Sequence, residues 1–584
     1  MIIPMKKVAL IVEAKDGESA VRGIRSLGVL HVEHQTPPAG KDIASLKDDI
    51  SILDKVVAIL LAPELADKSG LATLKLLKDW RFTAKHILDT YARIDHLVEY
   101  SASLRARIEE YRIWGDFDPE AAAQLRGRGV HIGLYLVPAG EVGTLRKEHA
   151  VTTVAVEKGI AYCAVVSAAS LELPYRQVVF PKTGLNEMRM RLGDNEDILR
   201  SLKETLRKYT CAAGRFIEIR KAFARELVFH EAIKGMGSAG TLVYIVGYAP
   251  SEKAAGLEDF ARKNRLALSV SEPSEDDRVP TFVRTPRWVS IIAPVFRLIE
   301  IVPGYRELDI SPVFLLALSL FFGMIIGDAG YGALYITLTF FAQKKFGRKL
   351  KDHKVFFLFY LFSASAVMWG LLTGNVFGQE WYLKAGMKPI APILNDTKFL
   401  QAFCFFIGAV HLSLAHAWQG LRKLPSLTVL ADVGWISVIW AAFFLACMLI
   451  LGQALPACTR WLIIGGVTLV VIGTSPQRNI LKMIGNGLAN VALSIMNNFT
   501  DVVSYVRLFA VGLAGVAIAD TVNTLAAEAG NPVAQVLILF AGHTINIILG
   551  PMSVLVHGVR LNVLEFSGHA GLTWSGVRYK PLED

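Results

Sequence analysis

The chain has 584 residues, of which 53% are hydrophobic and 20% charged, and its mean hydropathy is +0.40. This composition is too apolar for an ordinary soluble protein and too charged for a membrane bundle alone. From Pro312 onward the chain holds 18 of its 62 Lys and Arg and 11 of its 52 Asp and Glu, which leaves 44 and 41 for the first 311 residues. We therefore expect a densely charged first half followed by a charge-poor, basic membrane domain.

The charge distribution, the cysteines and the motifs argue against several classes of function. The formal net charge of +10 lies mostly in short loops between apolar runs, which argues against nucleic-acid binding. The five cysteines form no CxxC pair, and the first residues lack the apolar core of a signal peptide, so we expect a cytosolic first half. The sequence contains no GxxxxGK[ST], HExxH or GxSxG motif, so we expect no ATP-hydrolysing site, no metal and no cofactor.

The first half is expected to combine short strands with long helices. Residues 5–34 read as strand, helix and strand, and further strand-like segments are HIGLYLV, VTTVAV, YCAVVSA and TLVYIVGYAP. Heptad-like apolar spacing runs from Ile43 to Leu60 and from Leu199 to Leu227, and another long helix is expected from about Leu71 to Ile113. We predict two small α/β modules bridged by an antiparallel coiled-coil arm. The alternative is a compact α+β domain in which these seams are ordinary core faces.

Eight apolar runs begin at Pro312, and we expect them to cross a hydrocarbon core of about 30 Å. The first two are short and could form one re-entrant hairpin. The runs are 312–327, 329–343, 355–376, 399–421, 428–451, 460–474, 490–527 and 533–566. The expected fold is an α+β cytosolic half with coiled-coil arms, followed by an all-α polytopic membrane domain of about eight transmembrane helices. The expected boundaries are 1–280 for the cytosolic domain, 281–311 for an interfacial linker and 312–584 for the membrane domain.

Loop charges predict the orientation of these spans. Alternate loops are rich in Lys and Arg, namely 344–354, Arg422 with Lys423, and Arg478 with Lys482. The other loops hold only four basic residues, which are Lys384, Lys388, Lys398 and Arg460. By the positive-inside rule we expect both termini to be cytosolic.

Arg507 is the ionisable residue placed deepest in an apolar run, in the segment SYVRLFAVGLAG. An ionised group inside a span costs at least a few kcal/mol and usually marks a function. A structural arginine that snorkels or caps a carbonyl is the alternative, which its central depth disfavours.

Two polar stripes flank Arg507 on successive runs. One leads to it from the cytosolic end and contains Asn490, Ser494, Asn497, Asp501 and Ser504. The other lies on the last run and contains His543, Asn546, Gly550, Ser553, His557 and Arg560. The spacings of three and four place each set on one helix face. We expect the first stripe to open inward and the second outward, with packing against neighbouring helices as the alternative.

Other polar residues within the spans give weaker signals. Asp328, beside glycines at an expected helix break, is interpreted as a helix cap. His411, His416 and Asp432 are expected to face the bundle interior, where about half of such residues would be structural.

The segments FFGMIIGDAGYG, SAVMWGLLTGNVFG, NNFTDVVSYVRLFAVGLAG and GHTINIILGPMSVLVHGVRLNVLEF resemble, in order, the membrane domain of the V/A-type ATPase a subunit, called subunit I in prokaryotes. The first half resembles the same family in KKVALI, LGVLHVEH, WGDFDPE and YIVGYAP. The resemblance covers nearly the whole chain. It implies a multi-pass stator subunit in the plasma membrane of a prokaryote, acting with a rotor ring of c/K proteolipids, peripheral stalk subunits and a central-stalk cap subunit.

The same resemblance assigns roles to single residues. Arg507 matches the family's essential arginine, Arg560 matches its second arginine, and His557 precedes the latter on the ion path. Two acidic positions of the eukaryotic pattern are Leu493 and Gly550 here, so its relay details do not transfer. Asn498, Asp501 or His543 could take the place of these two acids. The candidates for the inner half-channel are therefore Asn497, Asn498, Asp501 and Ser504. The candidates for the outer half-channel are His543, Asn546 and Ser553.

The rival hypothesis is a secondary transporter with a cytosolic regulatory domain, in which Arg507 binds an anionic substrate. It predicts two related halves in the membrane domain, and the sequence shows no inverted repeat. The sequence leaves open whether the coupling ion is H⁺ or Na⁺ and whether ATP is made or consumed.

Overall fold

The computed structural model describes residues 2–62, 79–169, 171–348, 350, 352–379, 390–477 and 479–583. The expected helix start near Leu71 lies outside the described residues, as do the loop residues Lys349, Lys351, Lys384, Lys388 and Arg478. Internal contacts divide the chain into two units. The first comprises Met1–Ile11, Val29–Glu33 and Val246–Pro581, and the second comprises Val12–Gly28, His34–Ile245 and Leu582–Asp584.

A small sheet opens the first unit. Its strand order is β2-β8-β1-β9, with β1 at Met5–Glu13, β2 at His31–Glu33, β8 at Leu242–Pro250 and β9 at Ala267–Ser271. β1 and β9 are antiparallel, with Lys7 opposite Ser271. Val8, Leu10 and Val12 are buried and alternate with more exposed residues, as a strand packed on one face requires. Helix α8 (Ala254–Lys263) packs on β9.

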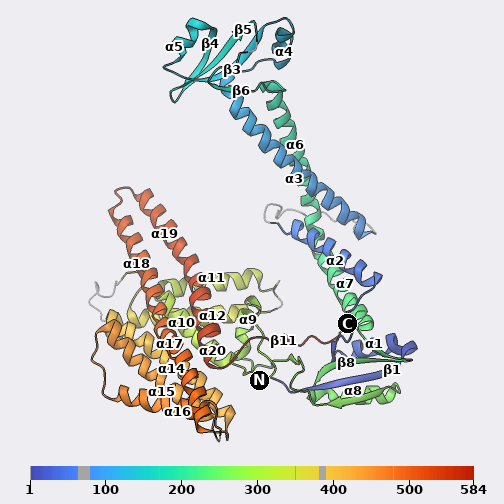
Figure 1. Cartoon of the computed structure of the whole chain (residues 1–584), viewed down its shortest axis with the longest axis vertical. Helices are drawn as coiled ribbons and strands as arrows, with labels where there is room; N and C mark the ends of the chain where they lie inside the picture. The colour runs from blue at the N-terminus through green and yellow to red at the C-terminus, as the bar shows by residue number, and fades with distance from the viewer. Residues whose placement is uncertain are drawn as a thin grey trace. The chain divides into compact units, whose positions relative to one another are not determined.

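The second unit contains two pairs of long helices and a second sheet. Helix α2 (Lys41–Leu60) packs on α7 (Ala213–Lys234), and α3 (Trp80–Tyr111) packs on α6 (Leu185–Tyr209) (Figure 1). The heptad positions Leu53, Leu60, Leu206 and Phe216 are buried in one shared cluster. Helix α1 (Gly17–Leu27) also belongs to this unit and ends at Gly28, whose left-handed φ of 60° favours glycine. The apolar seams read from the sequence therefore form the contacts between these helices.

The sheet of the second unit is antiparallel in the order β4-β5-β3-β6. Its strands are β3 (His131–Pro138), β4 (Ala150–Glu157), β5 (Ile160–Ser167) and β6 (Arg176–Val178), with α4 (Pro119–Gly127) and α5 (Val142–Glu148) beside them. Leu104 and Tyr111 of α3 share a buried cluster with Leu134 of β3 and Leu185 of α6. The end of the α3–α6 pair therefore packs directly against this sheet.

The helical bundle of the first unit begins at Ser311. Its helices are α10 (Ser311–Ile326), α11 (Ala329–Phe346), α12 (Lys354–Thr373), α14 (Thr397–Lys423), α15 (Val429–Leu451), α16 (Cys458–Thr474), α17 (Ile480–Ser504), α18 (Val506–Glu528), α19 (Pro532–Ser553) and α20 (Ser567–His569). The α19–α20 connection contains two π-helical segments, Val554–Gly558 and Leu561–Phe566. Large buried side chains, including Phe314, Phe405, Tyr505 and Phe566, form the core of the bundle.

The expected count of eight spans is not confirmed. Within the described residues, five helices are long and apolar enough to cross a membrane, or up to six if the bent pair α10–α11 is one span. That pair bends by 119° at Gly327, where φ is 63°. The Asp328 carboxylate accepts from the amide of Tyr331 at 3.0 Å, so it caps α11 as expected. Helix α16 has only 17 residues, which makes it short for a 30 Å core.

The last helices are longer than a membrane is thick. Residues Ile480–Glu528 form one apolar helix of 49 residues, equivalent to about 74 Å at 1.5 Å per residue. Residues Pro532–His569 extend over 38 residues, and only 6% of their apolar window is buried. Helices α18 and α19 pack on each other (Figure 1). They leave large apolar side chains exposed.

Candidate functional site

Arg507 and Arg560 meet at one buried carboxylate. Arg507 is the second residue of α18, and its Nη2 donates to Glu565 Oε1 at 3.1 Å. Arg560 Nε lies 3.7 Å from the same oxygen, and Ser504 Oγ contacts it at 3.4 Å. The Glu565 side chain is only 6% exposed, whereas that of Arg560 is 55% exposed. The site is therefore a buried anion with two cations, one of which reaches the surface of the bundle.

The π-helical backbone places Glu565 beside Arg560. In a regular α-helix, residues five apart point about 140° away from each other, whereas π-type i→i+5 bonding brings them toward the same face. Leu561–Phe566 is π-helical, and so is Val554–Gly558, which follows Pro551 inside α19. Proline removes a backbone donor and disturbs a regular ladder. The sequence reading, which assumed an α-helical period, missed Glu565. The available signal was that Glu565 is the one acid in the run 533–566.

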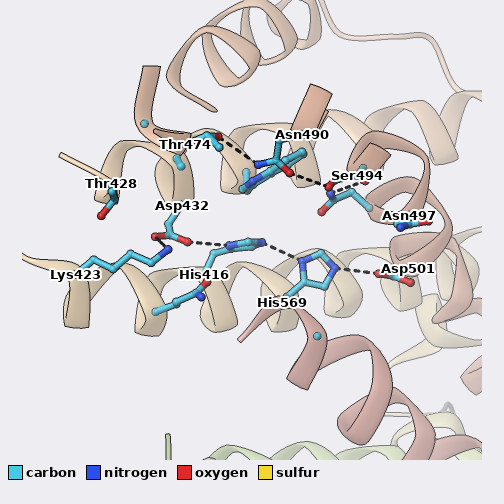
Figure 2. A pocket seen from close by; sticks show the side chains of 16 residues that line it. His416, Lys423, Thr428, Asp432, Thr474, Asn490, Ser494, Asn497, Asp501 and His569 are labelled. Atoms are coloured by element: carbon cyan, nitrogen blue, oxygen red, sulfur yellow. Dashed lines mark hydrogen bonds and ion pairs between the residues drawn. The ribbon is translucent and has the colours of Figure 1, made fainter. Parts of the chain in front are cut away.

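A cavity of about 600 Å³ lies before Arg507 along α17 (Figure 2). Its walls come from α14, α15, α16, α17 and the end of the last helix. The lining residues are His416, Gln419, Lys423, Thr428, Ala431, Asp432, Trp435, Gly473, Thr474, Asn490, Ser494, Asn497, Asn498, Asp501, Gly568 and His569. The inner candidates Asn497, Asn498 and Asp501 therefore share one cavity. Ser504 lies one helical turn further along, in contact with Glu565 rather than in the cavity lining.

One wall of the cavity is a chain of charged and imidazole groups (Figure 2). Lys423 Nζ donates to Asp432 Oδ2 at 2.8 Å, and the other oxygen of Asp432 lies 3.3 Å from His416 Nδ1. His416 Nε2 lies 2.9 Å from His569 Nδ1, and His569 Nε2 lies 3.0 Å from Asp501 Oδ2. From the sequence we expected His416 and Asp432 to face the interior of the bundle. We did not predict that Lys423 and His569 would belong to this site.

The opposite wall carries neutral polar groups from α16 and α17. The amide of Asn490 donates to Thr474 Oγ1 at 3.2 Å, and Ser494 Oγ donates to Asn490 Oδ1 at 3.2 Å. Asn498 Nδ2 donates to the Ser494 carbonyl at 2.8 Å, while its buried Oδ1 has no hydrogen-bond partner. This unpaired oxygen leaves one acceptor available to a water or an ion.

The outer candidates form a compact hydrogen-bonded cluster. His543 Nδ1 lies 2.6 Å from the Tyr331 hydroxyl, and His543 Nε2 lies 3.1 Å from Asn523 Oδ1. Asn546 Nδ2 donates to the Tyr331 hydroxyl at 3.1 Å and to the Gly515 carbonyl at 2.9 Å. These contacts join α11, α18 and α19.

The remaining candidates on the last helix lie apart from that cluster. Ser553 and His557 are both half-buried, and His557 precedes Arg560 by three residues, close to the second π-helical segment. The structure therefore places His543 and Asn546 together, and places His557 near the arginines.

Two other polar residues of the bundle make structural contacts. Asp328 accepts from the amides of Phe377 at 2.9 Å and Gly378 at 2.7 Å, in addition to capping α11. His411 is buried, with Nδ1 2.8 Å from the Tyr505 hydroxyl and its ring stacked on Phe566. Among the described residues, no group of three or more His, Cys, Asp or Glu is arranged to hold a metal ion.

Comparison with known proteins identifies the class. No protein-family model matches the chain. It is 29% identical to the V-type ATP synthase subunit I of Borreliella burgdorferi, over 100% of this chain and 99% of that protein. It is also 29% identical to V-type ATP synthase subunit I 1 of Treponema pallidum, over the whole of both chains. The A-type ATP synthase subunit I of Methanocaldococcus jannaschii is 23% identical over 63% of this chain and 58% of its own length.

One solved structure is also similar, the crystal structure of the cytoplasmic N-terminal domain of subunit I, homolog of subunit a, of V-ATPase. It covers 45% of this chain and 99% of its own, with 16% identity and a TM-score of 0.23, which is too low to support an argument. The long sequence matches are to proteins named as ATP synthase subunits, and the apolar helices of this chain fit a membrane subunit. The chain is similar over its full length to V-type ATP synthase subunit I proteins and over part of its length to an A-type one, which confirms the family resemblance seen in its motifs.

Proposed function

We propose that this chain is the membrane stator subunit of a rotary V/A-type ATPase, which forms two ion half-channels against a rotor proteolipid ring and anchors peripheral stalks. The observation that carries the proposal is the position of Arg507. It lies six residues beyond Asp501 of the polar cavity, is bound to buried Glu565, and is followed by a last helix with little internal packing. A fixed cation at the end of a wet path suits the exchange of an ion with a carboxylate of another subunit.

The exposed face of α18 and α19 is the proposed contact with the rotor. Leu513, Phe540, Ile548 and Met552 are between 52% and 72% exposed. Apolar exposure on this scale suits either lipid or an apolar partner. The 55% exposed Arg560 on the same last helix makes lipid alone unfavourable, because a largely exposed guanidinium in hydrocarbon costs several kcal/mol. A ring of apolar helices that presents carboxylates satisfies both the apolar face and the cation.

The mechanism follows from charge. A rotor carboxylate crosses the lipid-facing arc in a neutral form, either protonated or ion-bound, because a bare charge in hydrocarbon is costly. Near Arg507, which is always cationic, the ionised carboxylate is favoured and its ion is released. The same fixed charge opposes the direct passage of a cation between the two half-channels.

We assign the half-channels from the polar clusters on each side of Arg507. The inner one is the cavity along α17, with Asn497, Asn498 and Asp501 in its lining and Ser504 linking it to Glu565. The outer one follows His543, Asn546 and Ser553, and His557 lies with the arginines on the ion path. From the basic loops we assign the mouth of the cavity to the cytosolic side of a prokaryotic plasma membrane, with cytosolic termini.

The soluble half is assigned to the stator. We propose that residues 1–280 are cytosolic, that 281–311 form an interfacial linker and that 312–584 form the membrane domain. The helix pairs α2–α7 and α3–α6 bury their apolar seams inside the pair and leave their charged faces outward, which suits docking of the peripheral stalks, with the central-stalk cap as a further partner.

Substitution of Arg507 tests the proposal in the purified complex, reconstituted in vesicles. Arg507→Ala should abolish ATP-driven ion transport while assembly persists. Arg507→Lys should fail as well, because an ammonium lacks the planar fork that binds a carboxylate. Arg560→Ala should impair transport less severely, because Arg560 lies further from Glu565. Near-normal pumping by Arg507→Ala would contradict the proposal, and ATP-independent substrate transport would favour a secondary transporter.

A further inference from the structure

We propose that Asp432, His416, His569 and Asp501 form a relay that holds one exchangeable proton, so that the ion carried through the inner cavity is H⁺. This inference rests on the proposed function, because it names the ion that the inner half-channel supplies. It depends on the number of protons that the hydrogen bonds among these four side chains require, and on the distances between the bonded atoms.

The four groups are joined by three consecutive contacts. They run from Asp432 Oδ1 to His416 Nδ1 at 3.3 Å, from His416 Nε2 to His569 Nδ1 at 2.9 Å, and from His569 Nε2 to Asp501 Oδ2 at 3.0 Å. Both nitrogens of both imidazoles are therefore engaged. The residues come from α15, α14, α20 and α17, so the chain crosses the cavity wall from one helix to the next (Figure 2).

These contacts require one proton more than the neutral groups supply. Each of the three links needs one hydrogen, whichever atom carries it. Two neutral imidazoles contribute one N–H each, and two ionised carboxylates contribute none. Whichever tautomers His416 and His569 adopt, one link would then join two acceptors. A third proton, on an imidazole or on a carboxyl group, completes the chain.

The first passage of a proton along the chain needs no rearrangement of the heavy atoms. Proton transfer from His569 Nε2 to Asp501 forms one O–H bond and breaks one N–H bond. With the third proton initially on Asp432, the proton on His416 Nε2 then passes to His569 Nδ1. The carboxyl proton of Asp432 passes to His416 Nδ1, and Asp432 takes a new proton from cavity water. One proton enters at Asp432, one leaves from Asp501, and the chain keeps three. Ring rotation restores the original tautomers.

The surroundings of the relay set its direction and exclude a metal ion from it. At one end of the relay, Lys423 Nζ donates to Asp432. The side-chain amide nitrogen of Gln419, when turned toward Asp432 Oδ1, lies 3.1 Å from that oxygen. Beyond Asp501, Ser504 Oγ contacts the carboxylate that binds Arg507 and donates to the Asp501 carbonyl at 2.8 Å. Two ring nitrogens 2.9 Å apart hold a hydrogen between them but leave no room for a sodium ion.

Chemical rescue tests the relay in the reconstituted complex. His569→Ala should lower ATP-driven proton pumping by about tenfold or more, since a positioned acid–base group contributes on that scale. Added imidazole should restore much of the rate, because the cavity has room for it, and should not accelerate the unsubstituted complex. His411→Ala provides the matched control: this buried histidine bonds to Tyr505 outside the relay, so imidazole should give no rescue. If His569→Ala fails to assemble, His569→Gln should assemble and show a pH profile of pumping that differs from that of the unsubstituted complex.

The outcomes separate this inference from the proposed function. Proton pumping in sodium-free medium, together with imidazole rescue, supports the relay. An assembled His569→Ala complex that pumps normally, or that imidazole does not rescue, overturns it, as does an unchanged pH profile in His569→Gln. Transport of sodium without proton movement also overturns the relay, while loss of coupling in Arg507→Ala would still uphold the stator assignment.

Discussion

The inner and outer polar stripes near Arg507 differ in how their neighbours pack. Along α17 the facing residues include Ala431, Gly473 and Gly568, and the polar side chains border a cavity of about 600 Å³. At the outer end, the rings of Tyr331 and Phe377 lie about 6 Å from that of His543 and fill the space around it. The same sequence pattern therefore produces a cavity where the neighbours are small and a closed hydrogen-bonded cluster where they are aromatic.

If these two clusters act as the proposed half-channels, the difference implies that they are not equally open. The cavity can admit water without rearrangement. The outer cluster needs a rotation of the Tyr331 hydroxyl, or of His543, before an ion can pass, because both ring nitrogens of His543 are already hydrogen-bonded. Under the proposed function, we expect ion exchange with the outer side to be the slower step.

Filling the cavity should give the largest effect. Ser494→Trp places an indole in the wall formed by α17, and it should block transport by at least about tenfold, because the water path is interrupted. Ile464→Trp, at an α16 position that is 57% exposed, provides the matched control and should pump normally. Both are measured as ATP-driven transport in vesicles of equal protein content. Equal rates would show that the cavity is not the path.

Removing the hydroxyl of Tyr331 should have an intermediate effect. Tyr331→Phe keeps the ring but deprives His543 and Asn546 of a shared partner, at a cost of about 1–3 kcal/mol if they stay unsatisfied. We expect transport to fall several-fold, less than with the blocked cavity, because water can take the place of the hydroxyl. A lower Tm with an unchanged transport rate per assembled complex would instead identify the cluster as packing only.

The smallest effect on the ion path should come from the soluble arm. Leu206 is 1% exposed in the cluster between the helix pairs, so Leu206→Asp should disrupt the arm and loosen the peripheral stalks. Thiol accessibility of the membrane cavity should not change. Native gels report stalk retention, and Arg200→Asp, at a side chain that is 74% exposed on the same helix, is the matched surface control. Full stalk retention in Leu206→Asp would contradict the stator assignment of the arm.

The sequence predicted the features that depend on a regular period. The α-helical spacing of Asn490, Ser494, Asn497 and Asp501 placed them on one face, and the structure gathers them around one cavity. The heptad positions of the arms also became buried seams, as at Leu53 and Leu206. Such patterns are legible because each depends on neighbours within a few residues along the chain.

The features that escaped prediction depend on irregular backbone or on distant segments. Glu565 reaches the arginines through π-helical turns that no α-helical period describes. His569 joins Asp501 across 68 residues, after the end of the last apolar run. The eight-span count is not confirmed, because a left-handed Gly327 bends α10–α11 into one broken pair and α16 is short. An acid inside an apolar run was the signal that could have revealed Glu565.

Thiol accessibility tests the two-sided path most directly. In a chain whose five native cysteines are replaced by serine, single cysteines would be placed by Asn497→Cys, Asp501→Cys, His543→Cys and Asn546→Cys in oriented membrane vesicles. The account predicts that a membrane-impermeant thiol reagent labels the first two from the cytosolic side alone, and the last two, more slowly, from the opposite side alone. Labelling of all four from one face, or of none, would contradict it.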